Sequence, residues 1–164
     1  MGKTKRVSFK AVKLLALDFD GVMTDNKVYV DDRGNETVRC SRSDGLGIER
    51  LTMKGIKVLV ISKEKNKVVR TRCKKLGIAC IQGVERKTTI LRQRAKVLKI
   101  PLRKTCYVGN DINDMECMRA AGIGCAVCDA HPNVLRCADY ITKRRGGAGA
   151  VREVCDLIVE GTKK

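Results

Sequence analysis

Apolar residues along the chain fall into short continuous runs that alternate with amphipathic stretches. The run Val12–Phe19 (VKLLALDF) ends close to an acid, and Ile56–Ile61 (IKVLVI) is of the same kind. Such runs are typical of strands that are buried on both faces of a parallel sheet. Shorter strands are expected at 78–81, 105–108, 123–127 and 140–141.

Residues with helical spacing separate these strands. Asp44 is expected to cap the first helix, and Gly55, Gly77 and Gly122 to end three of them. The expected helices lie at about 44–53, after residue 61 to about 75, at 86–98 and at 112–121, with a helical turn at 132–137 and a C-terminal helix at about 150–160. Strands that alternate with helices form βαβ units. The pattern therefore predicts an α/β fold, a Rossmann-like parallel sheet flanked by helices.

One segment departs from this alternation of strands and helices. Val28 and Val30, and then Val38 and Cys40, alternate with polar residues around the turn-forming sequence DDRGN. This pattern predicts a β-hairpin at about 27–40, inserted after the first strand. The chain has no internal repeat, low-complexity segment or linker, so its 164 residues are expected to form one domain, 1–164.

The composition narrows the class of protein. Hydrophobic residues make up 43%, which is too much for a disordered basic tail. No apolar run approaches the roughly 18 residues of a membrane span. The basic start of the chain lacks a small-residue cleavage site, so no signal peptide is expected. Nine cysteines, an odd number spread along the chain, fit a reduced cytoplasmic protein better than a disulfide framework.

The strongly basic charge raises the possibility of binding to nucleic acid. Lys and Arg total 35 against 18 Asp and Glu, so the formal net charge is +17. Aromatic residues are only 3%, which argues against stacking on single strands but leaves duplex binding open. The most basic segment, Lys63–Lys75, has seven Lys or Arg in thirteen residues. Val69 and Cys73 within it and Leu76 directly after it form an apolar face. We interpret it as a helix with a solvated face, and an anionic small molecule ranks ahead of nucleic acid as a partner.

A cysteine and histidine pattern suggests zinc at first sight. Cys125, Cys128 and His131 have the spacing C-x2-C-x2-H. The segment alternates like a short buried strand that runs into a turn, so the two thiols would point to opposite faces. The spacing places no fourth ligand, and a structural role is the favoured interpretation.

Polar residues follow the predicted strands at positions that a parallel sheet brings to one edge, where ligands bind. They are Asp18 and Asp20 after the first strand, Ser62 after the second, Lys87 after the third, and Asn110, Asp111 and Asp114 after the fourth. A carboxylate can attack phosphorus, and a second acid can protonate the leaving oxygen. A hydroxyl and an ammonium group can hold the phosphoryl oxygens. Two negative groups must approach each other, so a divalent cation is needed, and oxygen ligands favour Mg²⁺.

These residues, in this order, resemble the four motifs of the haloacid dehalogenase superfamily. The matching residues are Asp18–Asp25 (DFDGVMTD), Ser62, Lys87 and Gly109-Asn110-Asp111. More narrowly, the chain resembles the 3-deoxy-D-manno-octulosonate 8-phosphate phosphatase subfamily. That subfamily also includes phosphatases of nonulosonate (sialic-acid-type) 9-phosphates and the C-terminal domain of some CMP-sialate synthetases. The resemblance runs from about residue 12 to 160 and includes the hairpin.

The resemblance implies a role for each motif residue. Asp18 is expected to be the nucleophile that takes up the phosphoryl group. Asp20 is expected to be the general acid and base, with its backbone carbonyl toward Mg²⁺, so that both aspartates belong to the metal site. Ser62 and Lys87 are expected to hold the transferring phosphate.

The fourth motif departs from the family pattern. Members usually have Gly-Asp-Asp, with the first Asp on the metal, whereas this chain has Gly109-Asn110-Asp111. Asn110 offers a carbonyl oxygen without a charge, so the affinity for metal is expected to be lower. Asn110 is the first candidate for the Mg²⁺ ligand, and Asp111 is the second. Asp114 is either a further participant or a charge favoured by the dipole at a helix N-terminus.

The subfamily also implies how the substrate is covered. Its members contact the sugar-acid portion near the second motif, where Glu64, Arg72 and Lys75 are candidates, with solvated helix charges as the alternative. They lack a large cap domain and are tetramers, in which the hairpins meet at the centre and a neighbour helps to cover the site. The glycine-rich loop Arg145–Gly149 either closes over a site or is an ordinary surface loop.

The leading hypothesis is a cytoplasmic, Mg²⁺-dependent phosphatase. Its substrate would be a phosphorylated 2-keto-3-deoxy sugar acid, either the octulosonate 8-phosphate or a nonulosonate 9-phosphate. Asn110 and Glu64 tilt the choice toward the nonulosonate. The alternatives are a catalytically weak oligomerisation module associated with CMP-sialate synthesis and, supported by charge alone, a protein associated with nucleic acid.

Overall fold

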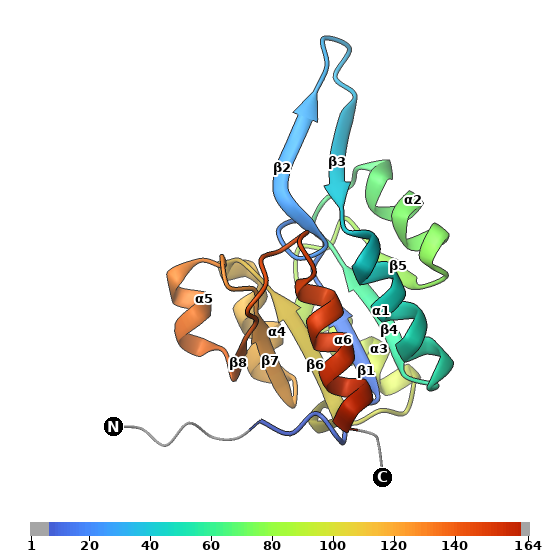
Figure 1. Ribbon diagram of the computed structural model, residues 1–164, viewed down its shortest axis with the longest axis vertical. Helices are drawn as coiled ribbons and strands as arrows, with labels where there is room; N and C mark the ends of the chain where they lie inside the picture. The colour runs from blue at the N-terminus through green and yellow to red at the C-terminus, as the bar shows by residue number, and fades with distance from the viewer. Residues whose placement is uncertain (1–6, 162–164) are drawn as a thin grey trace.

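The computed structural model describes residues 7–161. They form a six-stranded parallel sheet in the order β5-β4-β1-β6-β7-β8, with helices on both faces (Figure 1). The strands are β1 (Leu14–Leu17), β4 (Lys57–Ile61), β5 (Ala79–Ile81), β6 (Thr105–Gly109), β7 (Ile123–Ala126) and β8 (Tyr140–Ile141). The expected Rossmann-like α/β fold is confirmed. Residues 1–6 and 162–164 lie outside the described range. They include both ends of the expected domain 1–164 and part of the basic start of the chain, for which no signal peptide is expected.

Strand β1 lies at the centre of the sheet, and every one of its residues is 0% exposed. Ala16 pairs with Leu59 of β4 on one side and with Tyr107 of β6 on the other. From β1 the chain moves outward through β4 to β5, then crosses back to β6 and moves outward on the other side. The loops after β1 and β6 therefore diverge at a topological switch point, where open α/β sheets bind ligands.

The helices form two layers around the sheet. Helices α1 (Arg42–Met53) and α6 (Ala150–Gly161) pack against each other on one face, with α2 (Lys67–Leu76) beside α1. On the other face α3 (Lys87–Val97) packs against α4 (Met115–Ala120), with α5 (Pro132–Cys137) beside α4. Short 3₁₀ helices, η1 (Leu102–Lys104) and η2 (Ile112–Asp114), precede β6 and α4.

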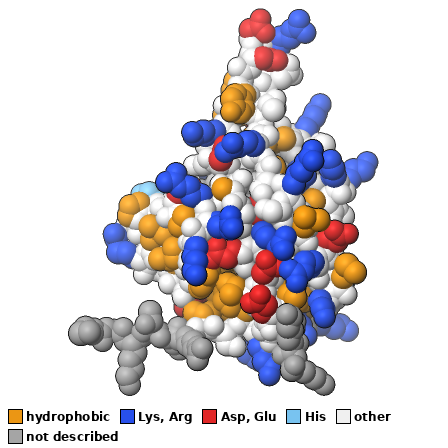
Figure 2. Space-filling model, in the orientation of Figure 1, with side chains coloured by type: hydrophobic (Ala, Val, Ile, Leu, Met, Phe, Trp, Pro, Cys, Tyr) orange, Lys and Arg blue, Asp and Glu red, His pale blue; other side chains and the backbone are white. Residues whose placement is uncertain are grey.

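The expected hairpin is present and projects beyond the carboxyl edge of the sheet (Figure 1). Its strands, β2 (Thr24–Val30) and β3 (Glu36–Cys40), form a separate antiparallel pair in which Val28 faces Val38. The hairpin begins three residues earlier than expected, directly after the loop that follows β1. Val28, Tyr29 and Val30 are 50%, 66% and 61% exposed. The projecting part therefore presents apolar side chains to its surroundings (Figure 2).

Two helices differ from the expectation because of the bonds that acidic side chains make at their starts. Helix α1 begins at Arg42, with Ser41 rather than Asp44 at its N-cap. Asp44 is buried and instead accepts the backbone N–H of Arg152 in α6, at 2.9 Å. The helix expected at 112–121 is divided into η2 and α4 by a capping box between Asp111 and Asp114.

Within residues 7–161, no helix has the length and apolarity needed to cross a bilayer.

Candidate active site

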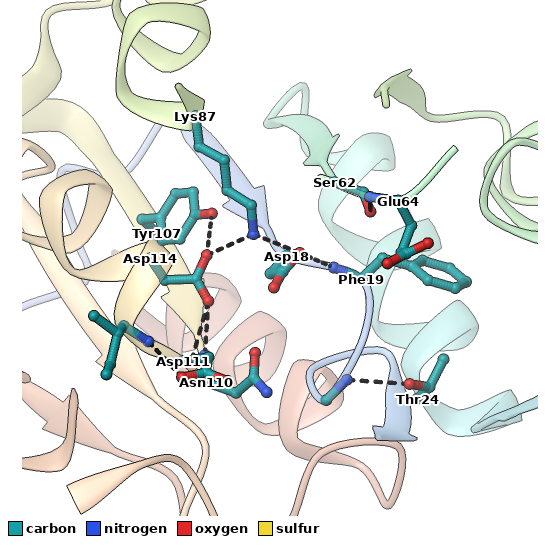
Figure 3. Close-up of polar contacts among 12 residues, drawn as sticks. Asp18, Phe19, Thr24, Ser62, Glu64, Lys87, Tyr107, Asn110, Asp111 and Asp114 are labelled. Atoms are coloured by element: carbon teal, nitrogen blue, oxygen red, sulfur yellow. Dashed lines mark hydrogen bonds and ion pairs between the residues drawn. The ribbon is translucent and has the colours of Figure 1, made fainter. Parts of the chain in front are cut away.

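The residues of all four motifs meet in one cavity of about 140 Å³ at the carboxyl edge of the sheet. Asp18 and Asp20 come from the loop after β1, and Lys87 is the first residue of α3. The cavity is lined by Asp18, Asp20, Asn26, Ser62, Lys63, Glu64, Lys87, Asn110, Asp111 and Asn113. Figure 3 shows how Lys87, Asp18, Ser62 and Asn110 reach this space from different elements. The parallel sheet thus assembles the side chains that the sequence places after four of its strands.

Asp18 is the buried centre of this arrangement, with 6% of its surface exposed. Its Oδ1 accepts a hydrogen bond from the backbone N–H of Phe19 at 2.7 Å and lies 2.8 Å from Lys87 Nζ. Burial raises the pKa of Asp18 to about 7, helped by the nearby charge of Asp114 and opposed by Lys87. The carboxylate is therefore oriented by two donors and has little access to water.

Lys87 is held between two carboxylates. Its Nζ lies 2.8 Å from Asp18 Oδ1 and 2.9 Å from Asp114 Oδ1, and the side chain is almost fully buried. Burial by itself lowers the pKa of Lys87, but Asp18 and Asp114 raise it by more. The ammonium group thus remains charged at the edge of the cavity.

Asp114 holds Lys87 and the fourth motif together. Its Oδ1 accepts from Lys87 Nζ at 2.9 Å and from Tyr107 OH at 2.8 Å. Its Oδ2 accepts from the backbone N–H groups of Asn110 at 3.0 Å and Asp111 at 3.3 Å. Four donors occupy the carboxylate, which fits a supporting role better than metal binding. Asp114 thus bonds to the backbone at the start of η2, next to the helix where a charge at the N-terminus was expected. Its bonds to Lys87 and Tyr107 were not predicted from the sequence.

The loop after β1 is shaped by close packing against the fourth motif. Gly21 has a φ of +78°, and a Cβ there would lie 2.0 Å from Asn110 Nδ2. The N–H of Gly21 donates to Thr24 Oγ1 at 3.1 Å. Glycine at this position therefore permits both the left-handed turn and the approach of Asn110.

The side chains around Asp18 fit a magnesium ion. Asn110 Oδ1 is buried and has no hydrogen-bond partner within residues 7–161, which suits an oxygen that a cation would bind. Asn110 lines the same cavity as Asp18 and Asp20, so the donor set consists of oxygens, as Mg²⁺ prefers. Asp111 also lines the cavity, but its Oδ1 accepts the N–H of Ile112 at 2.7 Å and its side chain is exposed. Asn110 is therefore the better placed of the two expected ligands.

Ser62 and Asp20 are the two remaining motif residues in the lining of the cavity. Ser62 is buried at the end of β4, and its Oγ accepts the N–H of Glu64 at 3.1 Å. Asp20 is half-buried, and the desolvation raises its pKa, with smaller contributions in the same direction from Glu64 and Glu36. A raised pKa favours the protonated carboxyl that a general acid needs.

The three candidates for substrate contact are placed differently. Glu64 is exposed and lines the cavity. Arg72 does not line this cavity or the neighbouring cavity described below, and its guanidinium donates to the carbonyl oxygen of Ser41 at 3.1 Å. Lys75 is exposed in the last turn of α2 and also lines neither of these two cavities. The structure therefore brings Glu64 to the site and leaves Arg72 and Lys75 outside it.

A second cavity of about 220 Å³ adjoins the first, between the hairpin and the start of α2. The two cavities share Asp20, Asn26 and Glu64. Asn26 was not singled out from the sequence, although it follows the first motif directly and has a φ of +62°, which asparagine tolerates better than most residues. The shared residues make the second cavity a natural extension of the site.

The glycine-rich loop Arg145–Gly149 contacts the backbone after β1 and is not part of the lining of either cavity. The N–H of Gly147 donates to the carbonyl oxygen of Val22 at 3.0 Å. Gly147 has a φ of +65°, and a Cβ there would lie 2.4 Å from the backbone nitrogen of Asp25. The loop thus packs directly on the backbone that carries the first motif.

Cys125 and His131 of the zinc-like pattern have other partners. Cys125 is buried in β7, with its Sγ 3.5 Å from Cys106 Sγ. His131 Nδ1 accepts the N–H of Asn133 at 3.2 Å at the start of α5. They therefore form no metal site: across residues 7–161, no group of three or more His, Cys, Asp or Glu side chains is placed to hold an ion, and the magnesium site described above differs in using the amide oxygen of Asn110.

Comparison with known proteins agrees with the arrangement of the motifs. A family model for haloacid dehalogenase-like hydrolases matches residues 63–153. The 3-deoxy-D-manno-octulosonate 8-phosphate phosphatase of Escherichia coli (strain K12) is 40% identical over 149 residues, which cover 90% of this chain and 79% of that protein. The chain belongs to the haloacid dehalogenase-like hydrolase family. The resemblance drawn from the four motifs is confirmed.

Solved structures of this family share the fold over nearly the whole chain. The 3-deoxy-D-manno-octulosonate 8-phosphate phosphatase from Yersinia pestis has a TM-score of 0.92 and 36% identity, with 94% of this chain and 84% of that chain covered. The corresponding enzyme from Moraxella catarrhalis, in complex with magnesium ion, phosphate ion and KDO, has a TM-score of 0.91 and 38% identity, with 93% and 88% covered. This haloacid dehalogenase-like hydrolase is therefore similar to the octulosonate phosphatases in both sequence and fold.

Proposed function

We propose that this hydrolase is a Mg²⁺-dependent phosphatase that acts on a phosphorylated 2-keto-3-deoxy sugar acid through an aspartyl-phosphate intermediate. The observation that carries the proposal is the meeting of Asp18, Asp20, Ser62, Lys87 and Asn110 in one cavity. Its similarity to octulosonate 8-phosphate phosphatases supports the same reaction.

The chemistry follows from the two aspartates. An oxygen of Asp18 attacks the phosphorus of the ester, so that a P–O bond to Asp18 forms while the P–O bond to the sugar breaks. Asp20 gives its proton to the leaving oxygen and then removes a proton from the water that attacks the aspartyl phosphate. That second attack frees Asp18 and inorganic phosphate. The half-buried position and raised pKa of Asp20 suit this exchange of a proton.

The remaining residues stabilise charge on the phosphoryl group. Lys87 carries a fixed ammonium beside Asp18, and the hydroxyl of Ser62 can donate to a phosphoryl oxygen. Mg²⁺ would be held by the side chain of Asp18, the backbone carbonyl of Asp20 and Asn110 Oδ1. When bound, it offsets the repulsion between the nucleophile and the phosphate.

The substrate is either an octulosonate 8-phosphate or a nonulosonate 9-phosphate. The second cavity, with Glu64 at its border, offers space for the sugar portion next to the phosphate. Figure 2 shows Lys and Arg side chains spread over the visible face, and the net charge of +17 favours the approach of a substrate with phosphate and carboxylate groups. Glu64 and Asn110 favour the nonulosonate.

We further propose a homotetramer in the cytoplasm. The two cavities are small and open, and no cap domain covers them within residues 7–161, so a neighbouring subunit would shield the reaction from water. The exposed Val28, Tyr29 and Val30 on the hairpin supply an apolar surface for such contact. All nine cysteines lie within the described residues as free thiols, which suits a reducing compartment.

The proposal is tested by phosphate release from octulosonate 8-phosphate, nonulosonate 9-phosphates and phenyl phosphate, with Mg²⁺ and with a chelator. Asp18→Asn removes the nucleophile, so kcat is expected to fall on the order of 10³-fold or more. Asp32→Asn, the same change at an exposed residue of the hairpin, serves as the control.

Three results would contradict this function. Absence of release from every ester by a stable oligomer would favour the oligomerisation module. Equal activity of Asp18→Asn and Asp32→Asn would exclude Asp18 as the nucleophile. Salt-sensitive binding to DNA or RNA at physiological ionic strength, without phosphatase activity, would favour a nucleic-acid partner.

A further inference from the structure

Tyr107 is a buried residue that the four motifs do not include. It lies in the middle of β6 and is 0% exposed. Its partners in register on the neighbouring strands are Ala16 and Gly124, two small residues that leave room for a ring on the same face of the sheet. Phenylalanine would fill this apolar space equally well. The hydroxyl is therefore the part of the side chain that needs an explanation, because a buried polar group costs free energy unless it is bonded.

The hydroxyl of Tyr107 bonds to the same atom that holds Lys87. It donates to Asp114 Oδ1 at 2.8 Å, and Lys87 Nζ lies 2.9 Å from that oxygen (Figure 3). The other oxygen of Asp114 accepts the backbone N–H groups of Asn110 and Asp111. Asp114 is thus fixed by four donors that come from β6, α3 and the fourth motif.

Lys87 has two acceptors among the described residues, Asp114 Oδ1 and Asp18 Oδ1 at 2.8 Å. An ammonium group has three N–H donors, so one remains for a phosphoryl oxygen in the cavity that Lys87 lines. Where that donor points depends on how strongly each carboxylate attracts the ammonium group. A second donor on Asp114 Oδ1 weakens the attraction of that oxygen for Lys87.

We propose that Tyr107 is a positioning residue, which through Asp114 sets the place of the Lys87 ammonium between Asp18 and the phosphoryl group. This inference rests on the proposed phosphatase function. Without the hydroxyl, Asp114 Oδ1 would draw Lys87 toward itself and away from the cavity. Lys87 would then stabilise the phosphoryl group less, and the effect would be largest in the transition state, where the charge on that group changes.

The first test is the kinetics of Tyr107→Phe. We expect kcat to fall about tenfold, because Lys87 is displaced rather than removed, while loss of a direct donor costs on the order of 10²- to 10³-fold. KM is expected to change less than about threefold. Tyr140→Phe is the matched control, since it removes a hydroxyl bonded to Glu153 at 2.7 Å outside the site. Equal kinetics of the two variants would overturn the inference.

The second test asks whether Tyr107 acts through Lys87. Binding of orthovanadate, an analogue of the transferring phosphoryl group, is measured by calorimetry with Mg²⁺ in four proteins: the wild type, Tyr107→Phe, Lys87→Met and the double variant. We expect Tyr107→Phe to weaken binding about tenfold when Lys87 is present and less than about twofold when it is Met. Equal weakening in both backgrounds would mean that the hydroxyl only stabilises the fold, and would overturn the inference.

The outcomes separate this inference from the proposed function. If the wild type releases no phosphate from any ester, the function fails, and the vanadate cycle still tests the positioning role. If the wild type is active and Tyr107→Phe behaves as Tyr140→Phe, only the positioning role fails. Should Tyr107→Phe not fold, Asp114→Asn takes its place in the cycle, because it keeps the volume and removes the charge through which Tyr107 acts. Weakening that does not depend on Lys87 would again overturn the inference.

Discussion

At the scale of single residues, Asn110 departs from the Gly-Asp-Asp pattern that the resemblance implies for the fourth motif. Its Oδ1 is buried and has no hydrogen-bond partner among the described residues. An amide oxygen can bind a cation but brings no negative charge, so the Coulomb attraction of the site for Mg²⁺ is smaller. Asp18, a carboxylate in the lining of the same cavity, is already partly neutralised by Lys87 at 2.8 Å.

Asn110→Asp is therefore expected to tighten Mg²⁺ binding. The two side chains have nearly the same shape, so the close packing against Gly21 is kept while one negative charge is added. We expect the Kd for Mg²⁺, measured by calorimetry without substrate, to fall about tenfold. Asn113→Asp adds the same charge elsewhere on the cavity wall and is the control. Equal tightening in both variants would show that Asn110 is not a ligand.

The sequence predicted the site where motif residues follow buried strands, because such strands end at one edge of a parallel sheet. It did not predict Tyr107, since nothing in the sequence shows that a tyrosine within an apolar run bonds to an aspartate at a helix start. Arg72 and Lys75 were placed on the correct helix, but the direction in which each points depends on how α2 packs. That packing is a property of the folded chain.

At the scale of elements, the pairing of α1 and α6 depends on a buried carboxylate. Asp44 of α1 accepts the N–H of Arg152 in the first turn of α6, while its Oδ2 has no hydrogen-bond partner in the part of the chain that the structure describes. Burial raises the pKa of Asp44 to about 6, although the bond from Arg152 and the charges of Arg72 and Arg152 oppose the shift. The order and type of the helices and strands could be predicted from the apolar runs and the helical spacing. The contact between α1 and α6 could not be predicted, because Asp44 and Arg152 lie far apart in the sequence.

Asp44→Asn is expected to stabilise the protein above pH 6. The folded pKa of about 6 exceeds the 3.8 of an unperturbed aspartate, so Asp44 supports folding fully below pH 3.8 and loses this contribution as pH rises through 6. Asparagine keeps the acceptor for Arg152 without the charge. We expect the free energy of unfolding in urea to exceed that of the wild type by about 2 kcal/mol at pH 7.5, with little difference near pH 4.

Two further variants complete this test. Asp44→Ala removes the acceptor and is expected to lower the free energy of unfolding by about 1 kcal/mol at pH 4, where the charge is absent in the wild type. Asp32→Asn, at an exposed site, controls for the general effect of charge. A difference between Asp44→Asn and the wild type that does not vary with pH would contradict the explanation.

At the scale of the whole molecule, the hairpin projects away from the main sheet (Figure 1). Its two strands form a sheet separate from the main one, and Val28, Tyr29 and Val30 remain half-exposed or more. An isolated two-stranded hairpin is marginally stable in water, so contact with other hairpins would stabilise it. The sequence predicted the hairpin itself from alternation, while its projection from the sheet depends on the packing of the loop after β1.

Val30→Asp is expected to reduce the molecular mass measured by light scattering after size-exclusion chromatography. The added charge would be buried without a partner in any assembly that covers the hairpin. Val97→Asp is the matched control, because Val97 is 69% exposed in α3, away from the hairpin. If both variants keep the mass of the wild type, the hairpin is not the site of assembly.

The packing of Gly147 on the backbone of Asp25 makes the loop after β1 depend on a segment that lies far away in the sequence. A side chain at position 147 would collide with the backbone of Thr24 and Asp25, so one of the two segments would have to move. A substitution at a residue that lines neither cavity would therefore displace the loop that carries Asp18 and Asp20.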